Sequence, residues 1–358
     1  MDPLRRYHRQ TLLPGIGAEG QQRLGEARAA LVGCGALGCA IADALVRAGV
    51  GRLTLIDRDI VELTNLQRQS LFTEADAAEG LPKAEAARRR LGQVNSHVAI
   101  TSHVADFAPA MAERLAGFAG GNSPQVLLDG TDNFETRLLL NDLAVKHGIP
   151  LVYGGAVATR GMMAVILPGD GPCLRCILPE PPPAGSMPTC DTAGVLGPVA
   201  TIVGAAQAAE AIKLLVGARE QVSRTMLDFD VWRNVRRRLD LGQMRNPECP
   251  CCVHRQFDWL HGRRDAGTTS LCGRSAIQVA GRPGAAVDLA ALGERLGTHG
   301  AVQVNPFLMR AVLADERREE GAGAGPVELT VFADGRAIVA GVTAPARARA
   351  IYAKYIGA

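Results

Sequence analysis

Three cysteines lie close together near the middle of the 358-residue chain, in the segment "GPCLRCILPEPPPAGSMPTCD". Cys173 and Cys176 form a C-x-x-C pair, and Cys190 follows a run of prolines. A C-x-x-C pair can be a redox couple or half of a metal site, and a single thiol beside it can be a nucleophile. The rest of the sequence has to decide among these chemistries.

A second C-x-x-C pair, Cys249 and Cys252, occurs in "NPECPCC". Two such pairs in one chain are typical of a tetrahedral Zn²⁺ site with four thiolate ligands. A redox C-x-x-C pair is expected at the start of a helix that follows a strand. The prolines in "CLRCILPEPPP" prevent this segment from continuing as a helix. We therefore expect Cys173, Cys176, Cys249 and Cys252 to bind zinc, with Cys251 as a competing ligand and a redox couple as the alternative.

Cys190 stands apart from both pairs. It precedes a long segment of small and apolar residues, which we expect to be a helix packed on a sheet. A proline before it and a glycine after it indicate a mobile loop, and a reactive thiol needs such access. The alternative is a small buried hydrophobic side chain, which is the role we expect for Cys34 and Cys39. The proline-rich residues 178–188 form either part of a crossover loop or a passive linker.

The elements that must position these cysteines begin with a strand, a glycine-rich turn, a helix and a second strand. Gly33, Gly35 and Gly38 follow the apolar run 29–32 in G-x-G-x-x-G spacing, and the second strand, "RLTLID", ends at Asp57. The glycines let backbone N–H groups approach a phosphate, and the acid can accept hydrogen bonds from a ribose. The pattern predicts nucleotide binding, but it does not distinguish a dinucleotide from ATP.

Polar residues after the second strand favour ATP. Asn65, Arg68 and Gln69 lie just past that strand, and Lys83 begins the next expected helix, after a proline suited to a first turn. Two cations and two amides at one edge of a sheet suit a polyphosphate better than a nicotinamide.

The acidic segment "DGTDN" follows a third expected strand. An acid at the carboxyl end of a parallel strand is placed to hold Mg²⁺ on bound phosphates, and we assign this role to Asp132. The alternative is that Asp129 or Asp132 caps the helix that follows.

The composition of the chain argues against several other classes of protein. The net charge of +3 and the lack of a long basic run argue against a nucleic-acid partner, so the short basic segments 5–9 and 233–238 are expected to be solvated. No apolar stretch is long enough to suggest a membrane span, and the first residues lack the apolar core of a signal peptide. We therefore expect a cytoplasmic protein, in which nine cysteines serve metal binding or catalysis rather than disulfides.

Eight motifs in order resemble the MoeB/ThiF (HesA/MoeB/ThiF) family of sulfur-carrier protein adenylyltransferases, which are relatives of ubiquitin-activating enzymes. The resemblance runs from about Arg6 to Gln256, and it rests on "RYHRQTLLPGIG", "GCGALG", "LTNLQRQ", "GLPK", "GTDN", "CLRC", "TCDTAGVLGPV" and "NPECPCC". It implies a Rossmann-like, doubly wound α/β fold with a mainly parallel sheet. One mild departure is Ala36, which stands where many members carry glycine.

The resemblance also implies a reaction and its partners. Family members use Mg-ATP to adenylate the C-terminal glycine of a ubiquitin-like carrier ending in Gly-Gly, of the ThiS or MoaD type, for thiamin or molybdopterin-type biosynthesis. A homodimer and a sulfur donor such as a cysteine desulfurase or a rhodanese are expected. The implied site comprises Asp57 on ribose; Asn65, Arg68 and Lys83 on phosphates; Gly33, Gly35, Ala36, Gly38, Gln69 and Asn133 on the nucleotide; Asp132 on Mg²⁺; Arg9 on the partner's ATP; and Cys190 in sulfur or thioester transfer.

The end of the chain is expected to be a second domain, so that residues 1–262 form the adenylation domain and 263–358 a small α+β domain of unknown role. Residues 261–270 look like a linker, and 315–325 like an exposed loop. Between and after them we expect strands and helices ending in a hairpin and a final helix. Cys272 could open a rhodanese loop, but a strand-like run follows it at once, and we reject that interpretation.

Two other classes of function stay open. An NAD(P)-dependent oxidoreductase could use the same βαβ unit, although "LTNLQRQ" and "GLPK" argue against it. A non-catalytic zinc module that senses a nucleotide would keep ATP binding without turnover.

Overall fold

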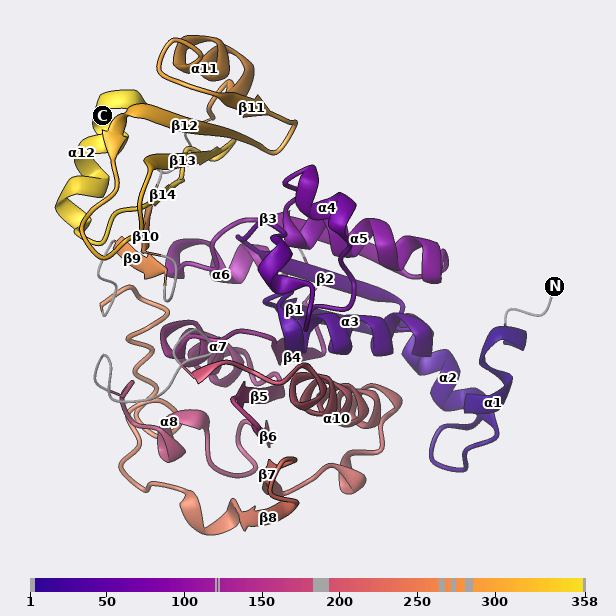
Figure 1. Cartoon of the computed structure of the whole chain (residues 1–358). Helices are drawn as coiled ribbons and strands as arrows, with labels where there is room; N and C mark the ends of the chain where they lie inside the picture. Colours follow the sequence, from indigo (N-terminus) through magenta and orange to yellow (C-terminus); the bar gives the residue numbers. More distant parts are fainter. Residues whose placement is uncertain are drawn as a thin grey trace. The chain divides into compact units, whose positions relative to one another are not determined.

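The computed structural model describes residues 4–119, 121, 123–182, 193–263, 268–271, 275–280 and 286–356 (Figure 1). The chain divides into two compact units, Met1–Arg264 and Asp265–Ala358. Each unit has its own sheet, and each is described here by itself.

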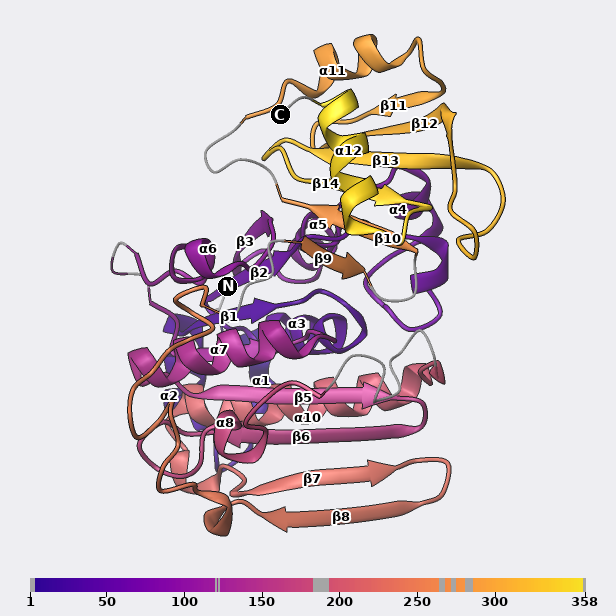
Figure 2. The ribbon, with the colours of Figure 1, turned by 90° about the vertical axis from the view of Figure 1, so that its left-hand side faces the viewer.

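The first unit is built on an eight-stranded sheet in the order β3-β2-β1-β4-β5-β6-β7-β8. Strands β1 to β5 run parallel, and β6 to β8 extend the sheet in antiparallel fashion, as Figure 2 shows. The predicted doubly wound, mainly parallel sheet is therefore confirmed. The strands are β1 (Arg28–Val32), β2 (Arg52–Asp57), β3 (Ala99–Val104), β4 (Val126–Asp129), β5 (Leu151–Val157), β6 (Arg160–Ile166), β7 (Thr225–Asp230) and β8 (Val235–Asp240).

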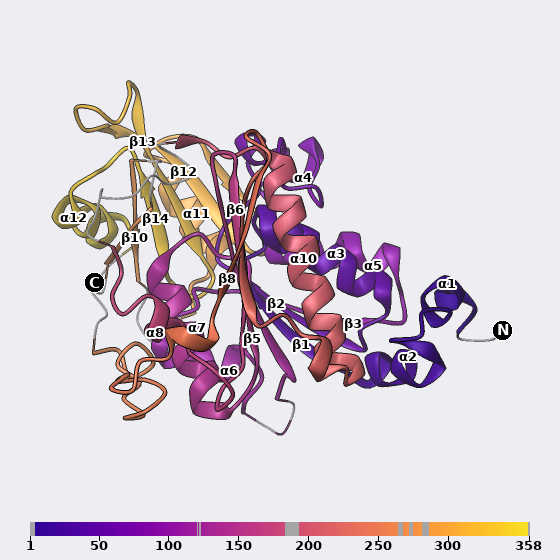
Figure 3. The ribbon, with the colours of Figure 1, turned by 90° about the horizontal axis from the view of Figure 1, so that it is seen from below.

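Helices cover both faces of this sheet. Figure 3 shows α3, α5 and α10 on one face and α6, α7 and α8 on the other. The helices and 3-10 turns are η1 (Arg5–Tyr7), α1 (His8–Thr11), α2 (Gly17–Glu26), α3 (Ala36–Ala48), η2 (Leu63–Asn65), α4 (Glu74–Ala78), α5 (Lys83–Val94), α6 (Pro109–Leu115), α7 (Phe134–His147), α8 (Leu174–Ile177), α10 (Gly197–Val216), η3 (Arg219–Gln221) and η4 (Gly242–Met244).

The predicted strand–turn–helix–strand unit is β1–α3–β2. Strand β1 is buried along most of its length because helices cover both faces of a parallel sheet, and this explains its continuous apolar run. Helix α3 begins after Gly35 and ends at Gly49, whose φ of +89° is the left-handed conformation that glycine adopts most easily. The sequence pattern therefore fixes both the start and the end of this helix.

The small-residue segment predicted to pack on the sheet is α10. It contacts β5, β6 and α3. Among the described residues it is the helix long and apolar enough to cross a membrane by length and composition alone, and 56% of that window is buried inside the protein. A core helix passes the same test, and its packing on the sheet accounts for its apolar composition.

The second unit is a six-stranded antiparallel sheet in the order β11-β12-β13-β14-β10-β9, with α11 on β11 and β12 and with α12 on β10 and β14. The predicted Asp334–Gly335 hairpin joins β13 to β14, and Gly335 has φ +83°. The elements are β9 (Thr268–Leu271), β10 (Ala276–Val279), α11 (Leu289–Leu296), β11 (Val302–Val304), β12 (Leu308–Arg317), β13 (Pro326–Phe332), β14 (Ala337–Ala340) and α12 (Pro345–Tyr355).

Two expectations for the second unit are wrong in part. The segment predicted as a linker contains β9, which pairs with β10 although its Thr-Thr-Ser composition carries no alternation of apolar residues. The segment predicted as an exposed loop begins inside β12, which continues to Arg317 across an irregularity after Leu313. In both places pairing with a neighbouring strand overrides the local polarity of the sequence.

Candidate functional site

The glycine-rich turn lies where the strand order reverses, between β1 and β4. In doubly wound sheets this switch point is where ligands bind. Gly33 has φ +90°, and a Cβ built on it would lie 2.6 Å from the carbonyl oxygen of Gly130 at the end of β4. A Cβ on Gly38 would lie 2.0 Å from the Gly33 oxygen. Only glycine fits at these two positions, because the backbones of two strand ends and one helix meet there.

Asp57 ends β2 beside this turn. Its carboxylate accepts hydrogen bonds from the backbone N–H groups of Cys34 (2.6 Å) and Asp59 (2.7 Å). Desolvation raises the pKa of Asp57, and the positive charge of Lys83 opposes that rise. The acid is thus fixed against the glycine turn, and its predicted contact with a ribose stays a prediction.

Lys83 is buried at the start of α5. Its Nζ lies 3.0 Å from the Asp59 carboxylate, and its side chain is 5% exposed. Pro82 is the N-cap and not the first helical residue, so the predicted first-turn position is off by one. The ammonium also acts electrostatically on Asp57 and on Cys34 of the glycine turn, so it places a positive charge near that turn, which suits an anionic ligand.

Asn65, Arg68 and Gln69 lie in and after the short η2 turn. Asn65 is buried and accepts a hydrogen bond from the Glu62 N–H group, so part of its capacity is used within the turn. Arg68 is half-buried, and its Nη1 donates to the carbonyl of Thr64. Both residues hold the turn in shape.

Gln69 faces the glycine turn. It is 4% exposed, and a Cβ built on Gly35 would lie 4.0 Å from its Nε2. Within the described part of the chain its Oε1 has no hydrogen-bond partner. A buried, unpartnered oxygen is costly, so a ligand or water that donates a hydrogen bond would be favoured there.

The "DGTDN" segment divides its roles among three residues. Asn133 caps α7 by accepting from the N–H group of Thr136 (2.8 Å), so the cap is neither of the two acids considered. Asp129 is 1% exposed, accepts from the N–H and hydroxyl groups of Thr131, and pairs with the Arg137 guanidinium. Asp132 is exposed, which leaves its carboxylate accessible to a ligand.

Arg9 does not join the other predicted residues. It is exposed on α1, next to Gln10, whose Nε2 donates to the carbonyl of Ala48 at the end of α3 (3.0 Å). Tyr7 packs against Gly49 at the same end. Because α3 has 13 residues and is about 20 Å long, this segment lies at the far end of the helix from the glycine turn.

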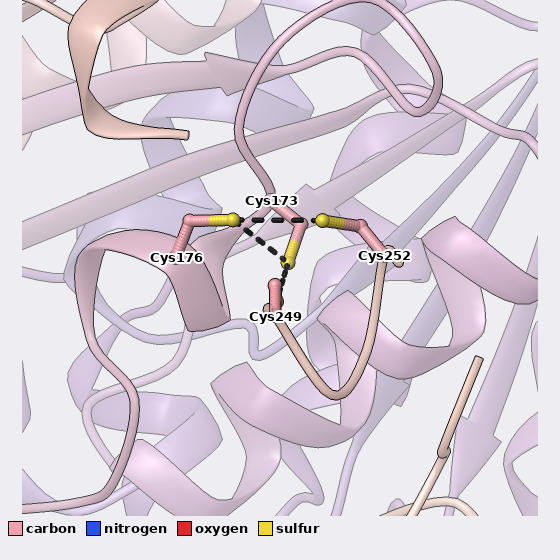
Figure 4. Close-up of side chains that lie close together, drawn as sticks. All are labelled: Cys173, Cys176, Cys249 and Cys252. Carbon is pink, nitrogen blue, oxygen red and sulfur yellow. Dashed lines mark hydrogen bonds between the residues drawn. The ribbon is translucent and has the colours of Figure 1, made fainter. Parts of the chain in front are cut away.

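The four cysteines of the two C-x-x-C pairs form one cluster, shown in Figure 4. Their sulfur atoms all lie within 4.8 Å of one another, with Cys173–Cys249 at 3.6 Å and Cys176–Cys252 at 3.5 Å. Four sulfurs bound at 2.3 Å around a tetrahedral Zn²⁺ would be separated by about 3.8 Å. The spacing therefore fits zinc.

Cys251 lies outside this cluster of four. It is buried, accepts a hydrogen bond from the Asn141 amide, and a hydrogen bond from its thiol lowers the pKa of Cys173 to about 5. It therefore supports a ligand and is not the competing ligand that the sequence suggested. Cys34 and Cys39 are buried, as expected, and burial raises the pKa of both thiols.

The structure tests only part of the remaining cysteine predictions. Helix α8 is a single turn that Cys173 caps, so the first C-x-x-C pair does begin a helix, although a very short one. Cys190 and most of the proline-rich segment lie outside the described residues, and so does Cys272. The roles assigned to them stay predictions.

The sequence interpretation missed Asp59, Arg137 and Gln207. Arg137 and Gln207 are buried, and Gln207 donates to the carbonyls of Asp129 (2.8 Å) and Val152 (3.1 Å). The available signal was proximity in sequence: Asp59 lies two residues after Asp57, and Arg137 lies in the first turn of the helix that follows Asp132. Nothing in the sequence singles out Gln207 among the small residues of its helix.

The fold is of the nucleotide-binding α/β class, and it carries a four-cysteine cluster. A family model described as "ThiF family" matches residues 7–251, and the chain belongs to this family. The resemblance found in the motifs is thus confirmed.

Individual relatives agree with this assignment. The chain is 40% identical over 353 residues, 98% of its length and 99% of the other protein, to the "Sulfur carrier protein ThiS adenylyltransferase" of Bacillus subtilis. It is 41% identical over 254 residues to the "Adenylyltransferase and sulfurtransferase MOCS3" of Sus scrofa, covering 71% of this chain and 54% of that protein. A crystal structure of E. coli MccB with ATP shares the fold, with a TM-score of 0.57 and 23% identity over 69% of this chain and 74% of that one.

Proposed function

We propose that this protein is an ATP-dependent adenylyltransferase that activates the C-terminal glycine of a ubiquitin-like sulfur-carrier protein. The observation that carries the proposal is the buried Lys83 ammonium, which pairs with Asp59 and acts electrostatically on Asp57 and on Cys34 of the glycine turn. The full-length similarity to the Bacillus subtilis protein supports the substrate class.

The reaction joins two anions. The carrier's terminal carboxylate attacks the α-phosphorus of ATP, an acyl–phosphate bond forms, and pyrophosphate leaves. Lys83 and Arg68 would bind the phosphates and reduce the repulsion between carboxylate and triphosphate. Asp57 would hold the ribose, and the backbone around Gly33, Gly35, Ala36 and Gly38 would let the nucleotide approach closely. Alignment and electrostatic stabilisation carry such a step, so no nucleophilic side chain is required.

Mg²⁺ and Zn²⁺ have distinct places in this proposal. Asp132 offers an exposed carboxylate at the end of β4, the type of ligand that Mg²⁺ prefers, and Asn133 lies next to it. Mg²⁺ held there would neutralise charge on the phosphates. The cysteine cluster has the thiolate ligands and spacing of structural Zn²⁺, and it would tie the segment after β6 to the segment after β8.

We infer that Arg9 acts on the ATP of a second copy in a homodimer. Its segment is docked at the end of α3 that is remote from the protein's own glycine turn. Beside it, Leu12 and Leu13 are 63% and 53% exposed, and such side chains are commonly buried in an interface.

The second unit favours a carrier of the ThiS type over one of the MoaD type. The similarity to the Bacillus subtilis protein extends over nearly the whole chain and so includes this unit, whereas the match to MOCS3 spans 254 residues. A cysteine desulfurase or a rhodanese would supply sulfur, and Cys190 would take part in its transfer. A Cys190→Ser variant should then adenylate the carrier but fail in sulfur transfer.

Pyrophosphate exchange tests the proposed reaction. Exchange of labelled pyrophosphate into ATP should require a carrier that ends in Gly-Gly, and a carrier lacking its last glycine is the matched control. Asp132→Ala should abolish exchange in a protein that remains folded, and retained exchange would rule out its role. A co-purifying nicotinamide cofactor would favour an oxidoreductase, and ATP binding without exchange for any carrier would favour a sensing module.

A further inference from the structure

Arg137 on α7 is a buried arginine, 8% exposed, that contacts the loop between β4 and α7. Its Nη2 donates to the carbonyl oxygens of Thr131 (2.9 Å) and Gly154 (3.3 Å). The Thr131 carbonyl belongs to the peptide unit that joins Thr131 to Asp132. The guanidinium therefore ties the backbone that enters Asp132 to strand β5.

Arg137 is also held by an ion pair with Asp129. Asp129 accepts from the Thr131 N–H group (2.9 Å) and hydroxyl (2.7 Å), and its second carboxylate oxygen lies 3.3 Å from the Nε of Arg137. Asp129 and Arg137 thus hold the two ends of Thr131, and each neutralises the other's buried charge. Because Thr131 is held at both its N–H group and its carbonyl, the position at which the next residue, Asp132, leaves the backbone is fixed as well.

The guanidinium has little freedom to move. It lies 5.2 Å from the centre of the Phe134 ring and 5.4 Å from that of Tyr153. A planar fork between two rings can donate to two carbonyls at fixed angles, whereas a lysine ammonium is a flexible point charge. The arrangement requires an arginine and not only a positive charge.

We propose that Arg137 is a positioning residue that fixes the Thr131–Asp132 peptide, so that the Asp132 carboxylate points toward the metal on the nucleotide. This inference rests on the proposed function only in the part that concerns the metal. The contacts that fix the loop belong to the protein without nucleotide, so they can be tested on their own.

The first test is amide hydrogen exchange in the protein without added Mg²⁺ or nucleotide. Arg137→Lys should speed exchange in the peptide 129–136 at least about tenfold, because the Thr131 carbonyl loses its donor and Asp129, the acceptor of the Thr131 N–H group, loses the guanidinium that holds it. The matched control is Arg28→Lys at the start of β1, where Nε of Arg28 donates to the carbonyl of Ser123 (2.9 Å). It should leave that peptide unchanged. Unchanged exchange in Arg137→Lys would overturn the proposal.

The second test measures the Mg²⁺ concentration that gives half-maximal pyrophosphate exchange at saturating ATP. Arg137→Lys should raise it about tenfold, whereas a merely structural loss would lower the maximal rate without moving the midpoint. A folded variant with the wild-type midpoint would refute the proposal. Absence of carrier-dependent exchange in the wild type would count against the proposed function, and the hydrogen-exchange result would still decide the role of Arg137.

A double variant keeps the proposal testable if Arg137→Lys fails to fold. Asp129→Asn with Arg137→Gln removes both buried charges together, so that neither is left unpaired. The asparagine keeps an acceptor for Thr131, while the link from the Thr131 carbonyl to Gly154 is weakened. It should show the same faster exchange in 129–136 and the same raised Mg²⁺ midpoint, and wild-type values in both would overturn the proposal.

Discussion

Replacing Gly38 by alanine should harm both stability and nucleotide binding, although alanine is normally the better helix residue. Gly38 lies in the first turn of α3, where alanine would ordinarily stabilise the helix by about 0.5–1 kcal/mol. A Cβ there would lie 2.0 Å from the Gly33 carbonyl oxygen, whereas ordinary contacts begin at 3.4 Å. The turn or the helix must therefore move by 3.4 − 2.0 = 1.4 Å.

The turn has no room to retreat. Gly33 already lies so close to Gly130 that a Cβ on it would be 2.6 Å from the Gly130 oxygen. Overpacking of this kind costs about 1–3 kcal/mol of unfolding free energy. A shift of about 1 Å in a group that positions a substrate lowers turnover by about 100-fold. We expect Gly38→Ala to lose about 1–3 kcal/mol of unfolding free energy and to lower turnover by about 100-fold.

Urea denaturation gives the change in stability, and calorimetric titration with ATP together with pyrophosphate exchange gives the functional loss. The matched control is Gly92→Ala in α5, where a Cβ meets nothing within 4 Å. That variant should gain about 0.5–1 kcal/mol and bind ATP normally. If Gly38→Ala were as stable as Gly92→Ala and bound ATP with wild-type affinity, the tight packing of the glycine turn would not be what holds the nucleotide site.

Three further predictions concern other parts of the first unit. If the cysteine cluster binds zinc as proposed, Cys249→Ser should lose zinc in metal analysis and about 4 kcal/mol or more of unfolding free energy; full zinc content would contradict the cluster's role. Hydrogen bonds from two arginines lower the pKa of Glu85 to about 2 from 4.5. The ionised carboxylate therefore contributes about 2 kcal/mol to the free energy of unfolding above pH 4.5, and this contribution is lost as the pH falls toward 2. Urea curves of Glu85→Gln should differ from those of the wild type at pH 7 but not near pH 2. In β5, Gly154→Ala would place a Cβ 2.4 Å from buried Gln207 and cost about 1–3 kcal/mol. Gly155→Ala meets ordinary contacts at 3.5 Å, and equal stability of these two variants would argue against the packing described.

Local sequence patterns were sufficient to predict the nucleotide-binding unit. The glycine spacing, the apolar run of β1 and the acid at the end of β2 are features within one βαβ unit, so periodicity and turn chemistry describe them well. The two C-x-x-C pairs lie far apart in sequence, yet they form the expected cluster, because metal-ligand spacing is itself a sequence signal.

Features that depend on tertiary contacts could not be predicted. Arg137 and Gln207 act by donating to backbone carbonyls of β4, β5 and the loop after β4, and a carbonyl has no sequence signature. Strand β9 was missed because its polar sequence has no strand-like alternation, whereas its pairing with β10 is a tertiary contact. The alternative that Asp129 or Asp132 caps α7 was wrong, because Asn133 provides the cap; all three residue side chains can accept a hydrogen bond from a helix N-terminus, so the residue types alone do not decide among them.

A crystal structure of the protein with an ATP analogue and Mg²⁺ would test the assignment of the nucleotide site most directly. We expect the triphosphate to lie against Lys83 and Arg68, the ribose against Asp57, and the metal against Asp132. A triphosphate bound elsewhere on the protein, or a nicotinamide dinucleotide at the switch point between β1 and β4, would contradict it.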